Sequence, residues 1–97
     1  IDDIDLDAAT LTLGGDVTAQ GNIAIDVTNA LVVGVDITSG NTTAITVTAD
    51  DTGVPVFTLN GGSTIDSSNG LFTLQADDVS IAGTINASGQ TALIRSN

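Results

Sequence analysis

The fold of this chain follows from two matching stretches, Leu11-Thr-Leu-Gly-Gly-Asp-Val-Thr-Ala-Gln-Gly21 and Val79-Ser-Ile-Ala-Gly-Thr-Ile-Asn-Ala-Ser-Gly89. When they are aligned, the apolar residues of one fall on apolar residues of the other, and the small residues that punctuate them coincide. Such a match within one chain indicates that a structural unit is used more than once. Within each copy apolar and polar residues alternate, which predicts a strand, a turn and a second strand.

Weaker copies of the same pattern begin at Leu31 and at Phe57, and a short apolar stretch follows each glycine-containing turn. The repeating unit is therefore roughly 18 to 24 residues long, and about four or five units fit in the chain. The stretch from Ala49 to Val56, which contains the single proline Pro55, does not match the pattern. We expect the unit that contains it to be longer or distorted.

The composition of the 97 residues favours an all-β domain. The chain contains no Met and a single Lys or Arg residue, all of its acidic residues are Asp, and Val, Ile and Thr are abundant. This removes most strong helix formers and keeps the residues that favour strands. We expect residues 1–97 to form a single repetitive segment, excised from a much longer chain.

Stacked repeats of this length predict a parallel β-helix, because a single unit cannot bury its apolar face alone. Glycines suit the corners, where the chain is expected to need unusual backbone angles. The competing fold is an antiparallel β-sandwich, which has a similar size but gives no reason for an internal repeat. The predicted core residues are Leu11, Leu13, Val17, Val35, Ile65, Ile81 and Ile85, and the predicted turn glycines are Gly15, Gly21, Gly40, Gly70, Gly83 and Gly89.

The net charge of −11 limits the partners of this chain. Phosphate binding needs clustered Lys and Arg, so nucleic acid is excluded, and an anionic membrane surface would repel the chain. No apolar run is long enough to cross a bilayer as a helix. Because the chain has no Cys, it has neither a disulfide framework nor a thiolate metal site.

The sequence gives little support for catalysis or for a cofactor. Ser and Thr are plentiful, but no His, Cys or Lys is present to activate one of them as a nucleophile. Asp50-Asp51 and Asp77-Asp78 could supply an acid and a base for glycoside cleavage. Adjacent residues of a strand point to opposite faces, however, so neither pair converges by itself. We expect a chain that is not an enzyme and holds no cofactor.

Asp3, Asp5 and Asp7 are the candidates for a metal site, because alternation places all three carboxylates on one face of a strand. Calcium is the cation that prefers such ligands, yet no complete calcium motif is present. The alternative is a solvated edge strand whose charges prevent end-to-end pairing. Thr10, Thr12, Thr46 and Thr48 invite an ice-binding interpretation, but the copies do not restore a continuous threonine row.

The stretch from Ala76 to Arg95, and more loosely Leu11 to Gly21, resembles the repeats of filamentous-haemagglutinin-like exoproteins, the large secreted adhesins of bacterial two-partner secretion systems. The resemblance implies a β-helical segment of an adhesin, extracellular or on the outer surface of a bacterial cell. Its implied role is structural: a shaft for adhesion, biofilm or filament formation. The implied partners are neighbouring coils, copies of itself, and host or matrix glycans. The alternative is a glycan- or calcium-binding β-solenoid module.

Overall fold

The computed structural model describes residues 2–49, 55–68, 70–87 and 92–95, and these residues form strands and connecting segments without a helix. The molecule measures 35 × 24 × 24 Å. The strands are β1 (Ile4–Ala8), β2 (Val17–Ala19), β3 (Ile23–Val27), β4 (Leu31–Val33), β5 (Ile37–Ser39), β6 (Thr43–Val47), β7 (Phe57–Leu59), β8 (Thr64–Asp66), β9 (Phe72–Gln75), β10 (Val79–Ile81), β11 (Thr84–Asn86) and β12 (Ala92–Arg95).

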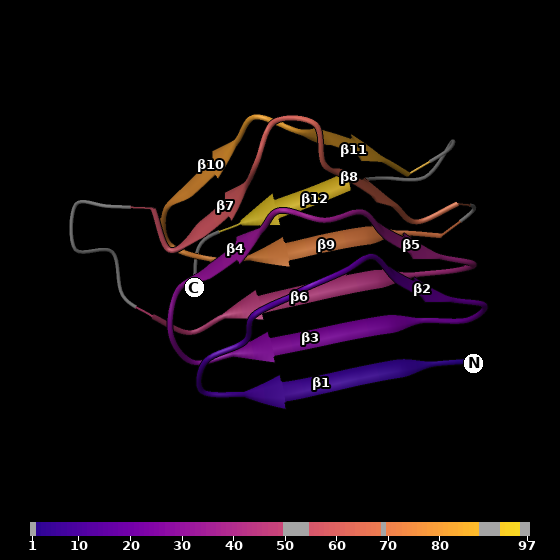
Figure 1. Cartoon of the computed structure of the whole chain (residues 1–97), viewed down its shortest axis with the longest axis horizontal. Coiled ribbons are helices and arrows are strands. Elements are labelled where there is room, and N and C mark those ends of the chain that lie inside the picture. The colour runs from indigo at the N-terminus through magenta and orange to yellow at the C-terminus, as the bar shows by residue number, and fades with distance from the viewer. Residues whose placement is uncertain (1, 50–54, 69, 88–91, 96–97) are drawn as a thin grey trace.

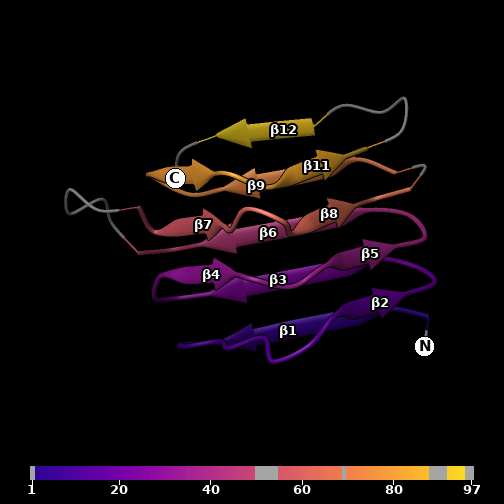
Figure 2. The ribbon, with the colours of Figure 1, turned by 45° about the horizontal axis from the view of Figure 1, so that its top comes forward.

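The strands form three sheets, and every pairing between described strands is parallel. Sheet A has the order β1-β3-β6-β9-β12, sheet B has β11-β8-β5-β2, and sheet C has β10-β7-β4. From β3 onward the chain visits sheets A, C and B in turn, whereas from β1 it reaches β2 of sheet B without a strand in sheet C. We call each passage a circuit: the first runs from β1 to β2, the second from β3 to β5, the third from β6 to β8 and the fourth from β9 to β11. Each circuit adds its strands to the growing edges of the sheets, so the circuits lie in layers with β1 at one end (Figures 1 and 2).

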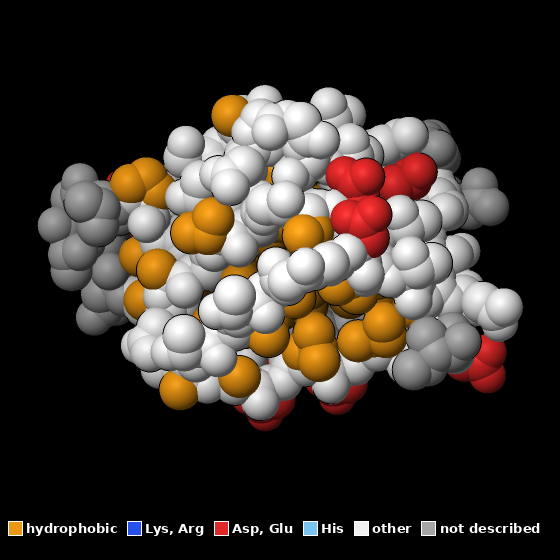
Figure 3. Space-filling model, viewed as in Figure 1, with side chains coloured by type: hydrophobic (Ala, Val, Ile, Leu, Met, Phe, Trp, Pro, Cys, Tyr) orange, Lys and Arg blue, Asp and Glu red, His pale blue; other side chains and the backbone are white. Residues whose placement is uncertain are grey.

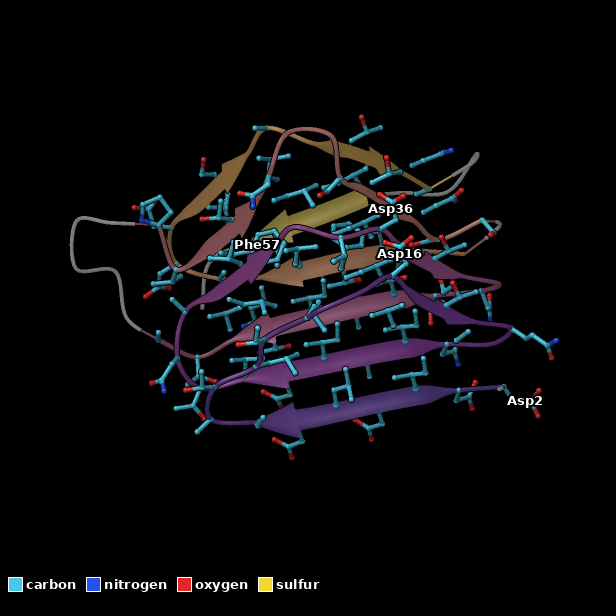
Figure 4. The ribbon with its side chains drawn as sticks, in the orientation of Figure 1. Asp2, Asp16, Asp36 and Phe57 are labelled. Atoms are coloured by element: carbon cyan, nitrogen blue, oxygen red, sulfur yellow. The ribbon has the colours of Figure 1, made fainter. Side chains whose placement is uncertain are left out.

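The interior between the sheets is filled by the inward-facing residue of each alternating pair. In β3, for example, Ile23, Ile25 and Val27 are buried, whereas Ala24 and Asp26 are exposed. Parallel register places like residues above one another, so apolar columns run along the molecule. One column is formed by Val17, Ile37, Ile65 and Ile85, and another by Leu31, Phe57 and Val79. Phe57 lies inside, between the sheets (Figure 4).

The circuits differ in length. A hydrogen bond between neighbouring circuits joins Asp3 to Asn22, 19 residues apart, and another joins Asn22 to Thr42, 20 apart. Across the third circuit the bond from Thr64 to Asp36 spans 28 residues. The extra residues lie mainly between β6 and β7, where the sequence departs from the repeat. This circuit is therefore longer than the predicted unit of roughly 18 to 24 residues, as expected for the stretch that contains Pro55.

The predicted core residues differ in burial according to their place in the stack. Ile65, in an inner circuit, is fully buried. Five others are half-buried and pack against the core, namely Leu11, Leu13, Val17, Val35 and Ile85. The prediction that Ile81 is buried is wrong, since its side chain is 38% exposed. Ile81 pairs with the fully buried Leu59, but no described strand of sheet C covers it on the other side.

The glycines of the corners are required by close approach and not by unusual backbone angles. Among the described glycines only Gly62 has a positive φ, of 85°. A Cβ on Gly21, Gly40 or Gly70 would collide with the backbone or side chain of the circuit beside it; at Gly40 the obstacle is the carbonyl oxygen of Gln20. Gly83 is confined in the same way by the carbonyl oxygens of Ser63 and Asn60.

Gly15 differs from the other predicted turn glycines. A Cβ added there would meet nothing within 4 Å, so no close contact requires glycine at this position. Gly89 lies outside the described residues. The prediction that the described corner glycines adopt unusual backbone angles is therefore wrong. Most of them are glycine because the backbone of the neighbouring circuit leaves no room for a side chain.

Candidate functional site

A groove lies on the surface between residues 10–13 of the first circuit and β4 of the second. Its volume is about 400 Å³. In the space-filling view, apolar side chains gather in a hollow on this face of the molecule (Figure 3). The lining residues are Thr10, Leu11, Thr12, Leu13, Ala30, Val32, Gly34 and Asn60.

The groove exists because the first circuit does not complete sheet C. By the repeat, Leu11 to Leu13 should form the strand beside β4, but this segment is not a strand and sheet C ends at β4. The prediction of a strand at Leu11 to Leu13 is therefore wrong. Leu11 and Leu13 remain half-buried, whereas Leu31 and Val33, their counterparts in the second circuit, are fully buried.

A one-residue difference in length explains why this strand fails to form. At the start of the segment the contacts join residues 19 apart, as in the hydrogen bond from Asn29 to Thr10. At its end they join residues 20 apart, as in the bond from Asp36 to Asp16. The first circuit is thus one residue short between these points. In a strand, a slip of one residue exchanges the inward and outward faces, so the segment cannot pair with β4 throughout.

The result is an unpaired sheet edge that faces the groove. Leu31 donates its N–H to the Val56 carbonyl, and the Val33 carbonyl accepts the N–H of Asn60, so both residues bond towards β7. In a parallel ladder alternate residues bond to opposite neighbours, so the N–H and C=O of Val32 point to the other side. No described strand pairs with β4 there, and the side chain of Val32 is 54% exposed.

Two carboxylates stand beside one end of the groove, each just after one of its walls. Asp16 follows Leu13 by three residues, and Asp36 follows Val33 by three. Asp16 Oδ1 accepts the Asp36 N–H at 3.0 Å, and Asp36 Oδ1 accepts the Thr64 N–H at 2.9 Å. The two side chains lie next to each other on the exposed surface (Figure 4). This arrangement joins successive circuits and also concentrates negative charge at the groove.

Asp3, Asp5 and Asp7 lie on the exposed side of sheet A at its β1 edge. Asp3 Oδ1 accepts the N–H of Asn22 at 2.9 Å, so it links the first two circuits. Within the described residues no three acidic side chains come close enough together to hold a metal ion. Asp3 therefore takes part in a hydrogen bond between circuits, and Asp3, Asp5 and Asp7 do not converge on a common point.

The other sequence candidates are spread over the molecule. Asp50 and Asp51 lie outside the described residues, and Asp77 and Asp78 are half-buried beside β10. Thr46 lies on the outward side of sheet A beside Asp26 and Gln75, so no threonine row forms there. No described segment is a helix that could cross a membrane.

Sequence reasoning did not identify the groove. Its one signal is the change in spacing between neighbouring copies, which becomes visible only when both ends of the first circuit are aligned with the second.

No protein-family model matches the chain, and comparisons with curated proteins and with solved structures find no match either.

Proposed function

We propose that this chain is a segment of a parallel β-helix and acts as a structural shaft without catalytic activity. The observation that carries the proposal is the in-register stacking of successive circuits, with apolar residues above apolar residues in each sheet. Such a stack is extended by adding circuits, because each circuit contacts only its neighbours. A shaft works by reach and rigidity, and each circuit lengthens it by about 4.8 Å.

The proposed setting is the outer surface of a bacterial cell, in a secreted adhesin that mediates adhesion or the formation of biofilms or filaments. The support for this is the resemblance of Ala76 to Arg95 to the repeats of filamentous-haemagglutinin-like exoproteins. The Asp-rich exterior agrees with a solvated rod, because charges on the outer faces and edges of sheets oppose aggregation. Host or matrix glycans are the ligands that such an adhesin would bind.

The shaft hypothesis is tested by adding a circuit. Duplicating residues 23–42, which carry β3, β4 and β5, inserts one complete 20-residue repeat between the second and third circuits. The chain should fold and lengthen by about 4.8 Å, as measured by small-angle X-ray scattering. The matched control is an insertion of 20 Gly and Ser residues at the same place. Loss of the folded state in the duplication variant, at the level of the control, would refute a stack of interchangeable circuits.

The proposed location is tested separately. Antibodies raised against residues 1–97 should label intact cells of the source organism or its culture medium. Labelling that requires permeabilised cells would exclude the surface role while leaving the shaft architecture intact.

Association with copies of itself is the remaining part of the proposal. Among the described strands, β1 is outermost in sheet A and β10 in sheet C, and Ile4, Leu6 and Val79 of these strands are half-buried apolar residues that another copy could cover. The net charge of −11 opposes contact between copies. Salt screens this repulsion, so the sedimentation coefficient should rise with salt concentration. A monomer at high protein and salt concentration would show that the ends do not associate.

A further inference from the structure

We propose that the groove between residues 10–13 and β4 binds an extended peptide segment of another protein, which pairs with β4 as an added strand. The segment carries apolar side chains at alternate positions and basic residues at the end that approaches Asp16 and Asp36. This inference concerns a binding site on the side of the molecule and does not depend on the proposed structural role.

The backbone of β4 provides the first part of the argument. Ala30, Val32 and Gly34 are alternate residues, and all three line the groove. Residues in alternate positions direct their backbone groups to the same side of a strand, so Val32 offers both a donor and an acceptor to an incoming chain. An extended peptide that adds to an open sheet edge gains affinity from these main-chain bonds.

The walls of the groove provide the second part. Leu11 and Leu13 are half-buried, and Val32 is more than half exposed, so apolar surface flanks the open edge. An added strand that alternates apolar and polar residues would cover this surface with one of its faces. The chain's own candidate for the position, the segment Leu11 to Leu13, is one residue short of the register that it would need.

Charge selects the kind of occupant. The chain has a net charge of −11 and a single basic residue, and Asp16 and Asp36 stand at one end of the groove. A second copy of this chain would bring the same negative charge to the contact and be repelled. A basic peptide would be attracted and oriented, because complementary charges favour encounter and fix register.

The test is a titration of the 97-residue chain with synthetic peptides, monitored by the NMR amide shifts of the protein. The probes are acetyl-Ser-Val-Thr-Val-Thr-Val-Lys-Arg-amide and the same peptide in reverse order, which cover both strand directions. The control replaces Lys-Arg by Glu-Glu. We expect saturable shifts at residues 11–13 and 30–34 with one basic peptide, and binding that is roughly tenfold weaker with the acidic control.

Variants of the groove sharpen the test. Val32→Pro removes the N–H that faces the groove and should abolish binding, whereas Val32→Thr keeps that N–H and should retain it; proline is tolerated at a sheet edge when its nitrogen faces solvent. Should Val32→Pro not fold, insertion of one threonine between Ala9 and Thr10 provides the second route. It supplies the missing residue, lets Leu11 to Leu13 occupy the edge, and should also abolish binding.

Three outcomes would overturn the proposal. One is the absence of saturable shifts with either basic peptide. Another is equal binding of the acidic control, which would show that charge does not select the occupant. The third is that increasing the concentration of the protein alone reproduces the shifts in the groove, which would assign the edge to a second copy.

Discussion

Leu11 to Asp16 and Leu31 to Asp36 have nearly the same sequence pattern, yet only the second forms a strand of sheet C. Both pack against the same interior, and both end in an aspartate that bonds to the next circuit. The difference is one residue of chain length between Thr10 and Asp16. The comparison teaches that in a stack of parallel strands the local pattern selects which residues face inward, while the length of each circuit decides whether they reach their partners.

The largest contrast between the two segments should come from charge in the interior. Val33 is fully buried, so Val33→Asp places an unpaired carboxylate among apolar neighbours. We expect a loss of about 4 kcal/mol or more, enough to unfold the chain. The matched variant Leu13→Asp lies in the open first circuit and should cost about 1 kcal/mol, since its carboxylate can reach water. Urea unfolding followed by circular dichroism measures both, and equal losses would show that the two segments are equally enclosed.

A second contrast concerns the glycines at the corners. Gly40 lies against the Gln20 carbonyl, so the methyl group of Gly40→Ala has no room unless the two circuits move apart. The expected loss is about 2 kcal/mol, typical of overpacking. Gly15→Ala, in the first circuit, adds a methyl group to open space and should change the free energy of unfolding by less than about 0.5 kcal/mol. A comparable loss in both variants would point to a requirement for glycine that is not steric.

Much of the fold is readable in the sequence because period-two alternation fixes which residues face inward. The repeat alignment places Val17 and Ile85 at the same position, and the structure puts both in one column of sheet B. Burial is less predictable, because it depends on what lies above and below. Ile81 and Leu59 are register partners, but among the described strands Leu59 has a sheet C neighbour on both sides and Ile81 has one on a single side.

The site was harder to foresee for the same reason. Asp16 and Asp36 become neighbours only through the spacing of 20 residues between successive circuits, and the groove depends on a deviation from that spacing by one. Alternation carries no information about either quantity. The glycines illustrate a related limit: their positions mark the described corners, but the reason for them is the neighbouring backbone, which the local sequence does not contain.

The difference between the two segments can be removed directly. Insertion of one threonine between Ala9 and Thr10 restores a constant spacing and brings Leu11 and Leu13 opposite Leu31 and Val33. Sheet C then gains a fourth strand, and we expect a stabilisation of about 1 kcal/mol from added apolar burial and ladder bonds. Hydrogen exchange at the Val32 amide should slow at the same time. A matched insertion after Gly14 leaves Leu11 and Leu13 out of register and should bring neither change.

The smallest expected effect concerns calcium. Asp3, Asp5 and Asp7 stand on the exposed side of the open β1 edge, where solvent can relieve their repulsion, and Asp3 is engaged by the N–H of Asn22. Since the described carboxylates form no group of three around a common point, calcium should add nothing specific to stability. Melting curves recorded with calcium and with a chelator should overlay, apart from the small shift that any chain of charge −11 shows when salt screens it.

The control variant Asp5→Asn removes one negative charge and leaves the hydrogen bond of Asp3 intact. It should reduce that small shift slightly, in proportion to the charge removed. A large drop in melting temperature on chelation, abolished by Asp5→Asn, would instead identify the edge of the first circuit as a calcium site.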